Sequence, residues 1–216
     1  MPPAGPSSCA DTPATDLETL LVWRRDVRHF DTRPVPETEM ERLFAATQLA
    51  PSVGNAQPWR LVRVLTPGLR AALADHVDDA ARQAALAYDD ERRATLYAAL
   101  KLHGLREAPQ IVAVFSDAAP PAGHGLGIAT MPEALHYSTV LAIHTLWLVA
   151  QSRGIGLGWV SILDPAWVAR LLDAPASWRF IALLCLGYPQ APSDVPELER
   201  RGWQARQDWW AHVSAR

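Results

Sequence analysis

The residues from Arg24 to Arg28 have the sequence RRDVR, which groups three arginines around one aspartate. Guanidinium groups bind phosphate through paired, charge-assisted hydrogen bonds, so these arginines could hold a phosphorylated ligand. The alternative is a solvated basic patch, because cationic residues are also favoured at the C-terminal end of a helix. A carboxylate at Asp26 would ordinarily neutralise part of this charge. The residue types alone leave both interpretations open.

A second stretch, residues 50–59, has the sequence APSVGNAQPW. Its small residues would let a ligand approach the backbone, and Ser52, Asn55 and Gln57 add a hydroxyl and two amides. Amides and backbone N–H groups suit the mixed donor and acceptor edge of a heterocycle. The alternative is an ordinary loop rich in proline and glycine.

A third stretch, residues 156–165, has the sequence GLGWVSILDP. We expect Ser161 to lie inside a buried strand, where its hydroxyl would need a hydrogen-bond partner. The glycines of GIGLG at 154–158 lack the order of strand, glycine turn and helix that a dinucleotide fingerprint requires. We interpret them as the end of a helix that leads into a strand. The seven histidines show no spacing typical of metal ligands.

Regular elements must position these stretches. Thr38 and Glu41 form a capping pair at the start of the second expected helix, and Asp164-Pro165 is typical of a further helix start. Residues 117–132 are rich in Pro and Gly and predict a long loop of the kind that forms lids or binding segments. Apolar spacing predicts helices at 15–24, 37–50, 68–87, 91–105 and 138–153, and strands at 59–65, 111–115, from about 156 through Ser161, and 179–187.

The expected helix at 138–153 is apolar on nearly every side, so it must be covered on every side, which a partner subunit would accomplish. Three tryptophans near the C-terminus, Trp203, Trp209 and Trp210, likewise indicate that this tail packs against something.

Composition excludes several classes of protein. The chain has 216 residues, 49% hydrophobic and 20% charged, with a formal net charge of -3. This balance is typical of a globular protein and argues against general nucleic-acid binding, which needs a concentrated basic surface. No segment predicts a membrane span or a signal peptide, and two cysteines fit a reducing compartment, so we expect a cytoplasmic protein. We expect a flexible tail at 1–14 and one domain at 15–216.

Together and in this order, the three stretches resemble the flavin-binding segments of the nitroreductase-like family, with the pattern R-R-x-x-R-x-F, A-P-S-x-x-N-x-Q-P-W and G-x-G-x-x-W-V. The resemblance implies an α+β fold with a mixed, mainly antiparallel sheet flanked by helices. It also implies an intertwined homodimer, joined through the apolar helix and wrapped by the C-terminal tails, with FMN at the subunit interface. The residues implied to contact FMN are Arg24, Arg25, Asp26, Val27, Arg28, Pro51, Ser52, Gly54, Asn55, Gln57, Leu102, Gly158, Trp159, Val160, Ser161 and Arg206.

Within this family the chain resembles the flavin destructases, through LKLHGLREAP at 100–109, MPE at 131–133 and PELERRGW at 196–203. That resemblance implies a reaction in which reduced FMN meets O2 and is fragmented to 5,6-dimethylbenzimidazole and a four-carbon sugar phosphate. It assigns proton transfer to Asp26 and the orientation of an intermediate to Ser161, as the catalytic residues. A separate flavin reductase could supply the reduced FMN.

Asn55 and Ala56 depart from the destructase pattern, which usually has two bulky apolar residues there, and agree with general nitroreductases. They favour an alternative in which FMN stays bound, NAD(P)H reduces it, and a nitro or quinone-like acceptor leaves reduced. A non-catalytic flavin carrier is a third hypothesis.

Overall fold

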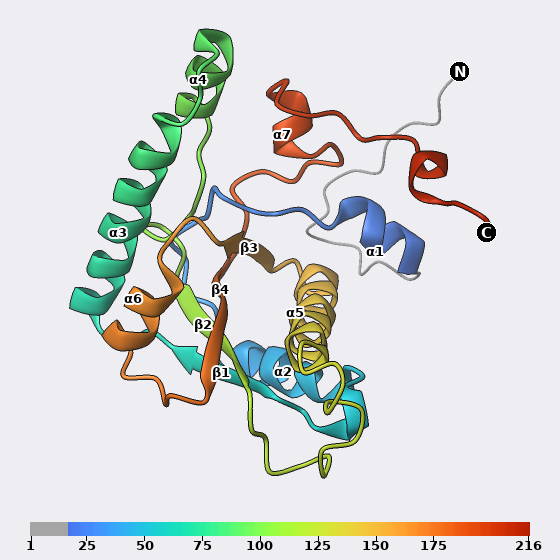
Figure 1. Cartoon of the computed structure of the whole chain (residues 1–216). Helices are drawn as coiled ribbons and strands as arrows, with labels where there is room; N and C mark the ends of the chain where they lie inside the picture. The colour runs from blue at the N-terminus through green and yellow to red at the C-terminus, as the bar shows by residue number, and fades with distance from the viewer. Residues whose placement is uncertain (1–16) are drawn as a thin grey trace.

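The computed structural model describes residues 17–216, so the expected tail at 1–14 and the expected helix start at Thr15 lie outside the described residues. Figure 1 shows one sheet with helices on both sides. The helices are α1 (Leu17–Trp23), α2 (Glu37–Ala46), α3 (Pro67–Ala85), α4 (Glu91–Ala98), α5 (Ala134–Ser152), α6 (Pro165–Leu171) and α7 (Glu197–Arg200). The strands are β1 (Trp59–Arg63), β2 (Gln110–Asp117), β3 (Gly156–Val160) and β4 (Trp178–Gly187), and three short 3-10 turns lie at Thr47–Leu49, Val53–Asn55 and Trp209–His212.

The sheet has the strand order β1-β2-β4-β3, and each neighbouring pair is antiparallel. One isolated parallel bridge joins Asp26 to Leu157 of β3. The predicted mixed, mainly antiparallel sheet flanked by helices is therefore confirmed. β2 and β4 occupy the centre, and β2 from Ile111 onward and β4 from Ala182 onward are buried, because helices cover both of their faces.

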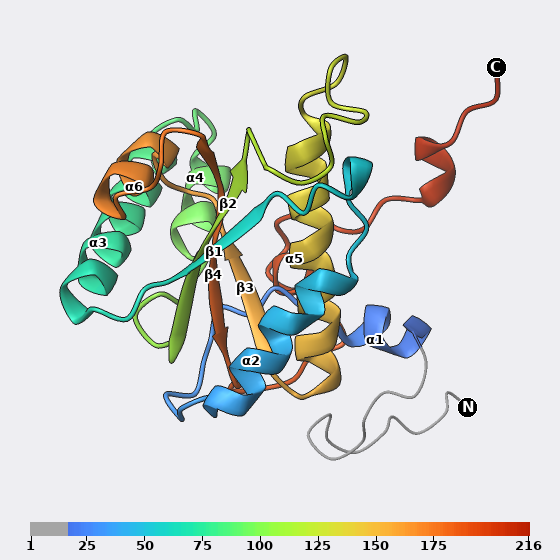
Figure 2. The same ribbon diagram turned by 90° about the horizontal axis from the view of Figure 1, so that it is seen from below.

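Side chains alternate between two apolar clusters, as the period of a strand requires. Val112 and Val114 of β2 point to one face and pack with α2 and α5, whereas Ala113 and Phe115 point to the other and pack with α3 and α6. Figure 2 shows these two pairs of helices on opposite sides of the sheet.

Helix α5 begins at Ala134, four residues before the predicted start, and is apolar along its length. Ile143, Leu146 and Ala150 are fully buried against the sheet. Val140 and Leu141, on the opposite side, are 41% and 44% exposed. The single chain thus covers only part of this helix. No helix within residues 17–216 is long and apolar enough to cross a membrane.

Two further predicted helix boundaries were wrong. Helix α2 begins at Glu37 after Pro36, with no side-chain capping bond, so Thr38 lies inside the helix and does not cap it. The helix expected at 91–105 ends at Ala98. The chain from residue 99 instead forms a loop that packs against Phe30, where a Cβ on Gly104 would come within 2.5 Å of the Phe30 ring.

The cap of α6 is confirmed and generates a first prediction. The Asp164 side chain accepts a hydrogen bond from the Ala166 N–H. We expect Asp164→Ala to lower the free energy of unfolding by about 1 kcal/mol, because one helix N–H loses its acceptor. Asp164→Ser keeps a capping oxygen and should lose much less. Urea unfolding of the three proteins checks this, and equal stability of the alanine variant and the parent would contradict it.

Candidate functional site

The arginine stretch runs along the free edge of β3. The Val27 N–H donates to the Leu157 carbonyl at 2.9 Å. Two glycines of β3 allow this approach: a Cβ on Gly156 would lie 2.7 Å from a Val27 methyl group, and a Cβ on Gly158 would overlap the Val27 carbonyl oxygen. The glycines of the third stretch therefore provide the surface on which the first stretch lies.

Asp26 links the two stretches through its side chain. Its Oδ1 accepts from the Trp159 N–H at 2.8 Å, and its Oδ2 accepts from Arg28 Nε at 3.0 Å. Burial raises the pKa of this carboxyl, although the charges of Arg28 and Arg24 and the hydrogen bonds from Trp159 and Arg28 act in the opposite direction. The side chain remains 31% exposed. A partly accessible carboxyl with a raised pKa is suited to proton transfer.

The three arginines of the stretch have different surroundings. The Arg24 guanidinium lies 4.5 Å from the centre of the Trp147 ring, and within residues 17–216 it donates no hydrogen bond. Burial lowers its pKa, Asp26 opposes this, and the nearby charge of Arg206 adds to it. Arg24 and Arg206 thus place two positive charges near each other.

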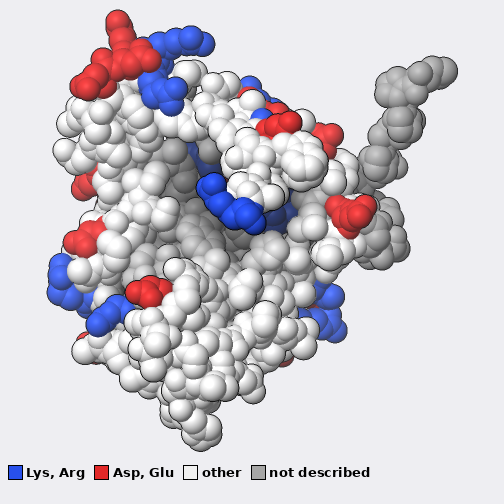
Figure 3. Space-filling model, turned by 45° about the vertical axis from the view of Figure 1, so that its right-hand side comes forward, with Lys and Arg blue, Asp and Glu red and all other residues white. Residues whose placement is uncertain are grey.

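Arg25 and Arg28 donate to groups of the chain itself. The Arg25 guanidinium donates to the backbone carbonyls of Val22, Arg24 and Asp194. Arg28 bonds Asp26 and, through Nη1, the Lys101 carbonyl at 3.3 Å, which brings the predicted contact residue Leu102 next to the stretch. Figure 3 shows a hollow on one face of the molecule where Lys and Arg side chains gather.

The second stretch is held in an unusual backbone conformation. Gly54, Asn55 and Gln57 all have positive φ, at 53°, 56° and 46°. For Asn55 and Gln57 such a conformation carries strain, which collects at functional sites. Ser52 Oγ accepts from the Gln57 N–H at 3.1 Å, and Gln57 Nε2 donates to the Asn55 side chain at 3.2 Å. Pro51 is exposed.

The loop at 117–132 packs on this second stretch. A Cβ on Gly54 would come within 2.6 Å of the Leu126 carbonyl oxygen. Ser138, near the start of α5, accepts from the Val53 N–H at 3.0 Å. The glycine at position 54 therefore allows the long loop to approach the second stretch, and Ser138 of α5 holds the second stretch in place.

The environment predicted for Ser161 was wrong. β3 ends at Val160, which is buried, whereas Ser161 is exposed. The chain turns there, with the Leu163 N–H donating to the Ser161 carbonyl, and then enters the capped helix α6. The hydroxyl therefore needs no protein partner. Trp159, by contrast, is half-buried in the strand.

Sequence reasoning missed the role of Trp147, which stacks with Arg24 and donates from Nε1 to the Arg25 carbonyl at 3.2 Å. Nothing in the apolar helix distinguishes this tryptophan from a core residue. Within residues 17–216, no three His, Cys, Asp or Glu side chains converge as metal ligands.

The model of the Nitroreductase family matches residues 21–188. The chain belongs to the nitroreductase family. A 5,6-dimethylbenzimidazole synthase of Rhodospirillum rubrum is 55% identical over 192 residues, which cover 88% of this chain and 90% of that protein. A 5,6-dimethylbenzimidazole synthase of Rhodobacter capsulatus is 52% identical over 188 residues, which cover 87% and 90%. The resemblance predicted from the three stretches is confirmed.

Solved structures agree on the fold. Iodotyrosine deiodinase bound to FMN and 3-iodo-L-tyrosine superposes with a TM-score of 0.68 at 24% sequence identity. The superposition covers 82% of this chain and 91% of the deiodinase chain. A nitroreductase of Exiguobacterium sibiricum in complex with FMN has a TM-score of 0.68 at 18% identity, covering 95% and 99%.

The raised pKa of Asp26 predicts how stability depends on pH. The folded protein holds this proton more tightly than the unfolded chain, so the stabilisation is present at low pH and is lost as pH rises through the folded pKa. We expect the stability of the parent, relative to Asp26→Asn, to increase between pH 7 and pH 4. Urea unfolding at both values measures it, with the exposed Asp89→Asn as control. A change in the opposite direction would show that the arginines outweigh burial.

Proposed function

We propose that the chain binds FMN beside the arginine stretch, with its phosphate held by Arg24 and Arg206. Arg24 has side-chain donors that no described residue uses, and the nearby charge of Arg206 adds to its own, which favours a dianionic group. The carbonyls of Val27 and Leu126 already lie where a Cβ of Gly158 and of Gly54 would be, so these glycines contribute by letting their neighbouring segments pack closely around the space proposed for the flavin ring. Gln57 adds polar groups toward that ring.

The other arginines of the stretch have different proposed roles. We propose that Arg28 addresses the ribityl end and that Arg25, which donates to backbone carbonyls, acts by holding the stretch in place. The remaining contacts that we propose are Val27, Pro51, Ser52, Asn55, Leu102, Trp159 and Val160.

The proposed reaction is the O2-dependent fragmentation of reduced FMN to 5,6-dimethylbenzimidazole and a four-carbon sugar phosphate. The observation that carries it is the Asp26 carboxyl, which is held at the arginine stretch with a raised pKa in a chain 55% identical to a 5,6-dimethylbenzimidazole synthase. When bound, reduced FMN supplies both the electrons and the carbon skeleton of the product.

Asp26 holds and transfers a proton, while the Trp159 N–H at Oδ1 and the Arg28 guanidinium at Oδ2 fix the position of its carboxyl group. The exposed Ser161 hydroxyl, just past the end of β3, donates or accepts a hydrogen bond from the bound molecule. A separate flavin reductase supplies reduced FMN, and the buried, free Cys185 suits the reducing cytoplasm.

The alternative function is a conventional reductase that uses NAD(P)H and retains its FMN. The amide of Asn55, hydrogen-bonded to Gln57 in the strained loop, is the observation that favours it. An NADH dehydrogenase of Thermus thermophilus is 29% identical over 204 residues.

We also propose a homodimer formed through α5. Val140 and Leu141 leave an apolar face of this helix uncovered, and Trp209 and Trp210 are 60% and 65% exposed. Figures 1 and 2 show the chain after α7 extending away from the sheet, in a position to reach a second copy. Both features would be costly in a monomer.

The reaction is tested by the product. Reduced FMN bound to the parent and exposed to air should lose its flavin absorbance and release 5,6-dimethylbenzimidazole, detected by mass spectrometry. Asp26→Asn should bind FMN and return it oxidised, with fragmentation slowed by roughly 10²–10⁴-fold. Recovery of intact FMN from the parent would favour the reductase, and equal fragmentation by both proteins would remove Asp26 from proton transfer.

The dimer is tested on the exposed side of α5. Leu141→Asp should give a monomer by light scattering, because a charge would have to be buried in the interface. Leu65→Asp, at a residue that is 64% exposed and far from α5 in sequence, serves as the control and should remain dimeric. A dimeric Leu141→Asp protein would place the interface elsewhere.

A further inference from the structure

We propose that the Asp78–His103 pair positions Arg28, and through Arg28 the Asp26 carboxylate, by holding the loop at 101–108 in place. This inference rests on the proposed function for its catalytic meaning. Its structural part concerns only contacts within the chain.

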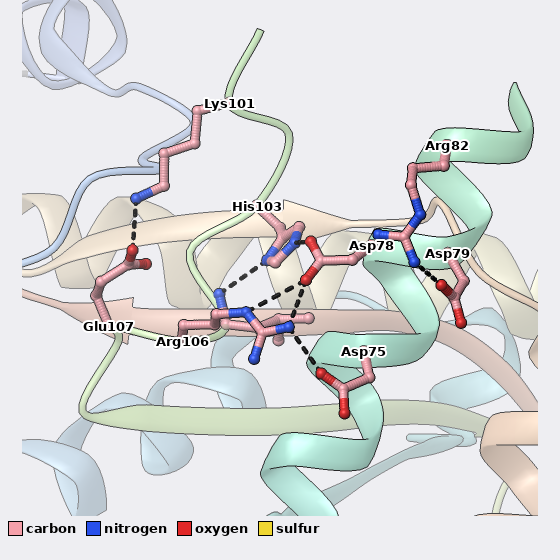
Figure 4. A network of polar contacts seen from close by, with 9 residues as sticks. Asp75, Asp78, Asp79, Arg82, Lys101, His103, Arg106 and Glu107 are labelled. Atoms are coloured by element: carbon pink, nitrogen blue, oxygen red, sulfur yellow. Dashed lines mark hydrogen bonds and ion pairs between the residues drawn. The ribbon is translucent and has the colours of Figure 1, made fainter. Parts of the chain in front are cut away.

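The pair joins helix α3 to the loop. His103 Nε2 lies 2.7 Å from Asp78 Oδ1, and the Leu105 N–H donates to His103 Nδ1 at 3.2 Å. Because Nδ1 accepts, a neutral ring carries its proton on Nε2 and donates it to Asp78. Figure 4 shows the imidazole pointing at the Asp78 carboxylate. The His103 side chain is only 10% exposed, so this contact is shielded from water.

Arg106 extends the polar contacts of Asp78 on the solvent side of the pair. Arg106 bonds Asp78 Oδ2 and also Asp75, 2.7 Å away, and its side chain is half exposed. Burial opposes ionisation of Asp78, but the hydrogen bonds from Arg106 and His103 together lower its pKa. Asp78 therefore stays anionic as the acceptor for His103. The Arg106–Asp75 contact is an exposed ion pair of the kind that adds little.

The loop in turn contacts the arginine stretch at two points. The Lys101 carbonyl accepts from Arg28 Nη1 at 3.3 Å. Gly104 lies against Phe30, whose ring is fully buried, and a Cβ at position 104 would also come within 3.1 Å of the Arg28 carbonyl. A shift of the loop would therefore be transmitted to the Arg28 side chain, which holds Asp26 Oδ2 through Nε and Nη2, each at 3.0 Å.

The charges that face Asp26 make the effect measurable. Arg28 and Arg24 act on it from its own stretch, and the Cys185 thiol faces it from β4. Burial raises the pKa of Cys185 to about 12, so the thiol is neutral. Weaker contact with Arg28 would leave Asp26 with less positive charge nearby, and its pKa would rise further.

Two substitutions of His103 separate its two hydrogen bonds. His103→Asn keeps an acceptor for the Leu105 N–H, as in an Asx turn, but is too short to reach Asp78. His103→Gln is long enough to donate to Asp78. Asp75→Ala removes only the outer contact of Arg106 and is the matched control.

The experiment measures the pKa of Asp26 in the flavin-free protein by carbon-13 NMR of aspartate carboxyls, with the signal assigned through Asp26→Asn. We expect His103→Asn to raise this pKa by about half a unit or more, His103→Gln to restore at least part of the shift, and Asp75→Ala to leave it unchanged. The pH dependence of flavin loss should move in the same direction. If His103→Asn lowers the unfolding temperature but leaves the Asp26 pKa unchanged, the Asp78–His103 pair stabilises the fold and does not position Arg28.

The two hypotheses fail in different ways. If the parent returns intact FMN, the proposed function is wrong, whereas the NMR titration still decides whether His103 acts on Asp26. If the parent fragments FMN and the titration shows no shift, only the positioning role is wrong.

Discussion

The backbone of Val27 lies directly against Gly158, and the rest of the candidate site depends on this contact. No side chain fits at position 158, because its Cβ would overlap the Val27 carbonyl. The contact closes the edge of β3, which would otherwise present unpaired backbone groups. It also brings Asp26 within 2.8 Å of the Trp159 N–H. This contact therefore joins Asp26 and Trp159, which are more than 130 residues apart in the sequence, in one site.

Holding the Asp26 carboxylate against β3 lowers the stability of the folded protein at neutral pH. Burial raises its pKa, so the ionised form is disfavoured even though Arg28 and Arg24 lie nearby. Natural proteins accept such local costs where a group must react, and the covered sheet of β2 and β4 provides the compensating apolar burial. The strained backbone at Asn55 and Gln57 is a second cost of the same kind, placed where the loop at 117–132 meets the second stretch.

The exposed apolar groups have a common explanation in the proposed homodimer. Helix α5 holds the second stretch through Ser138 and stacks Trp147 on Arg24, so its buried side organises the candidate site. Its other side carries exposed Val140 and Leu141. A partner that covered this side would enclose a flavin bound nearby and restrict its escape. Assembly and chemistry would then depend on the same helix.

The sequence by itself determined the family, the four strands and the positions of most helices, because periodic apolar spacing and the RRDVR, APSVGNAQPW and GLGWV stretches are local signals. It could not assign separate roles to Arg24 and Arg25, which are neighbours of identical type. Only the fold showed that Arg25 donates to distant Asp194 while Arg24 stacks on Trp147. The exposure of Ser161 and the Asp78–His103 contact were likewise decided by tertiary structure, since both depend on where the chain turns and on which segments, remote in sequence, then meet in space.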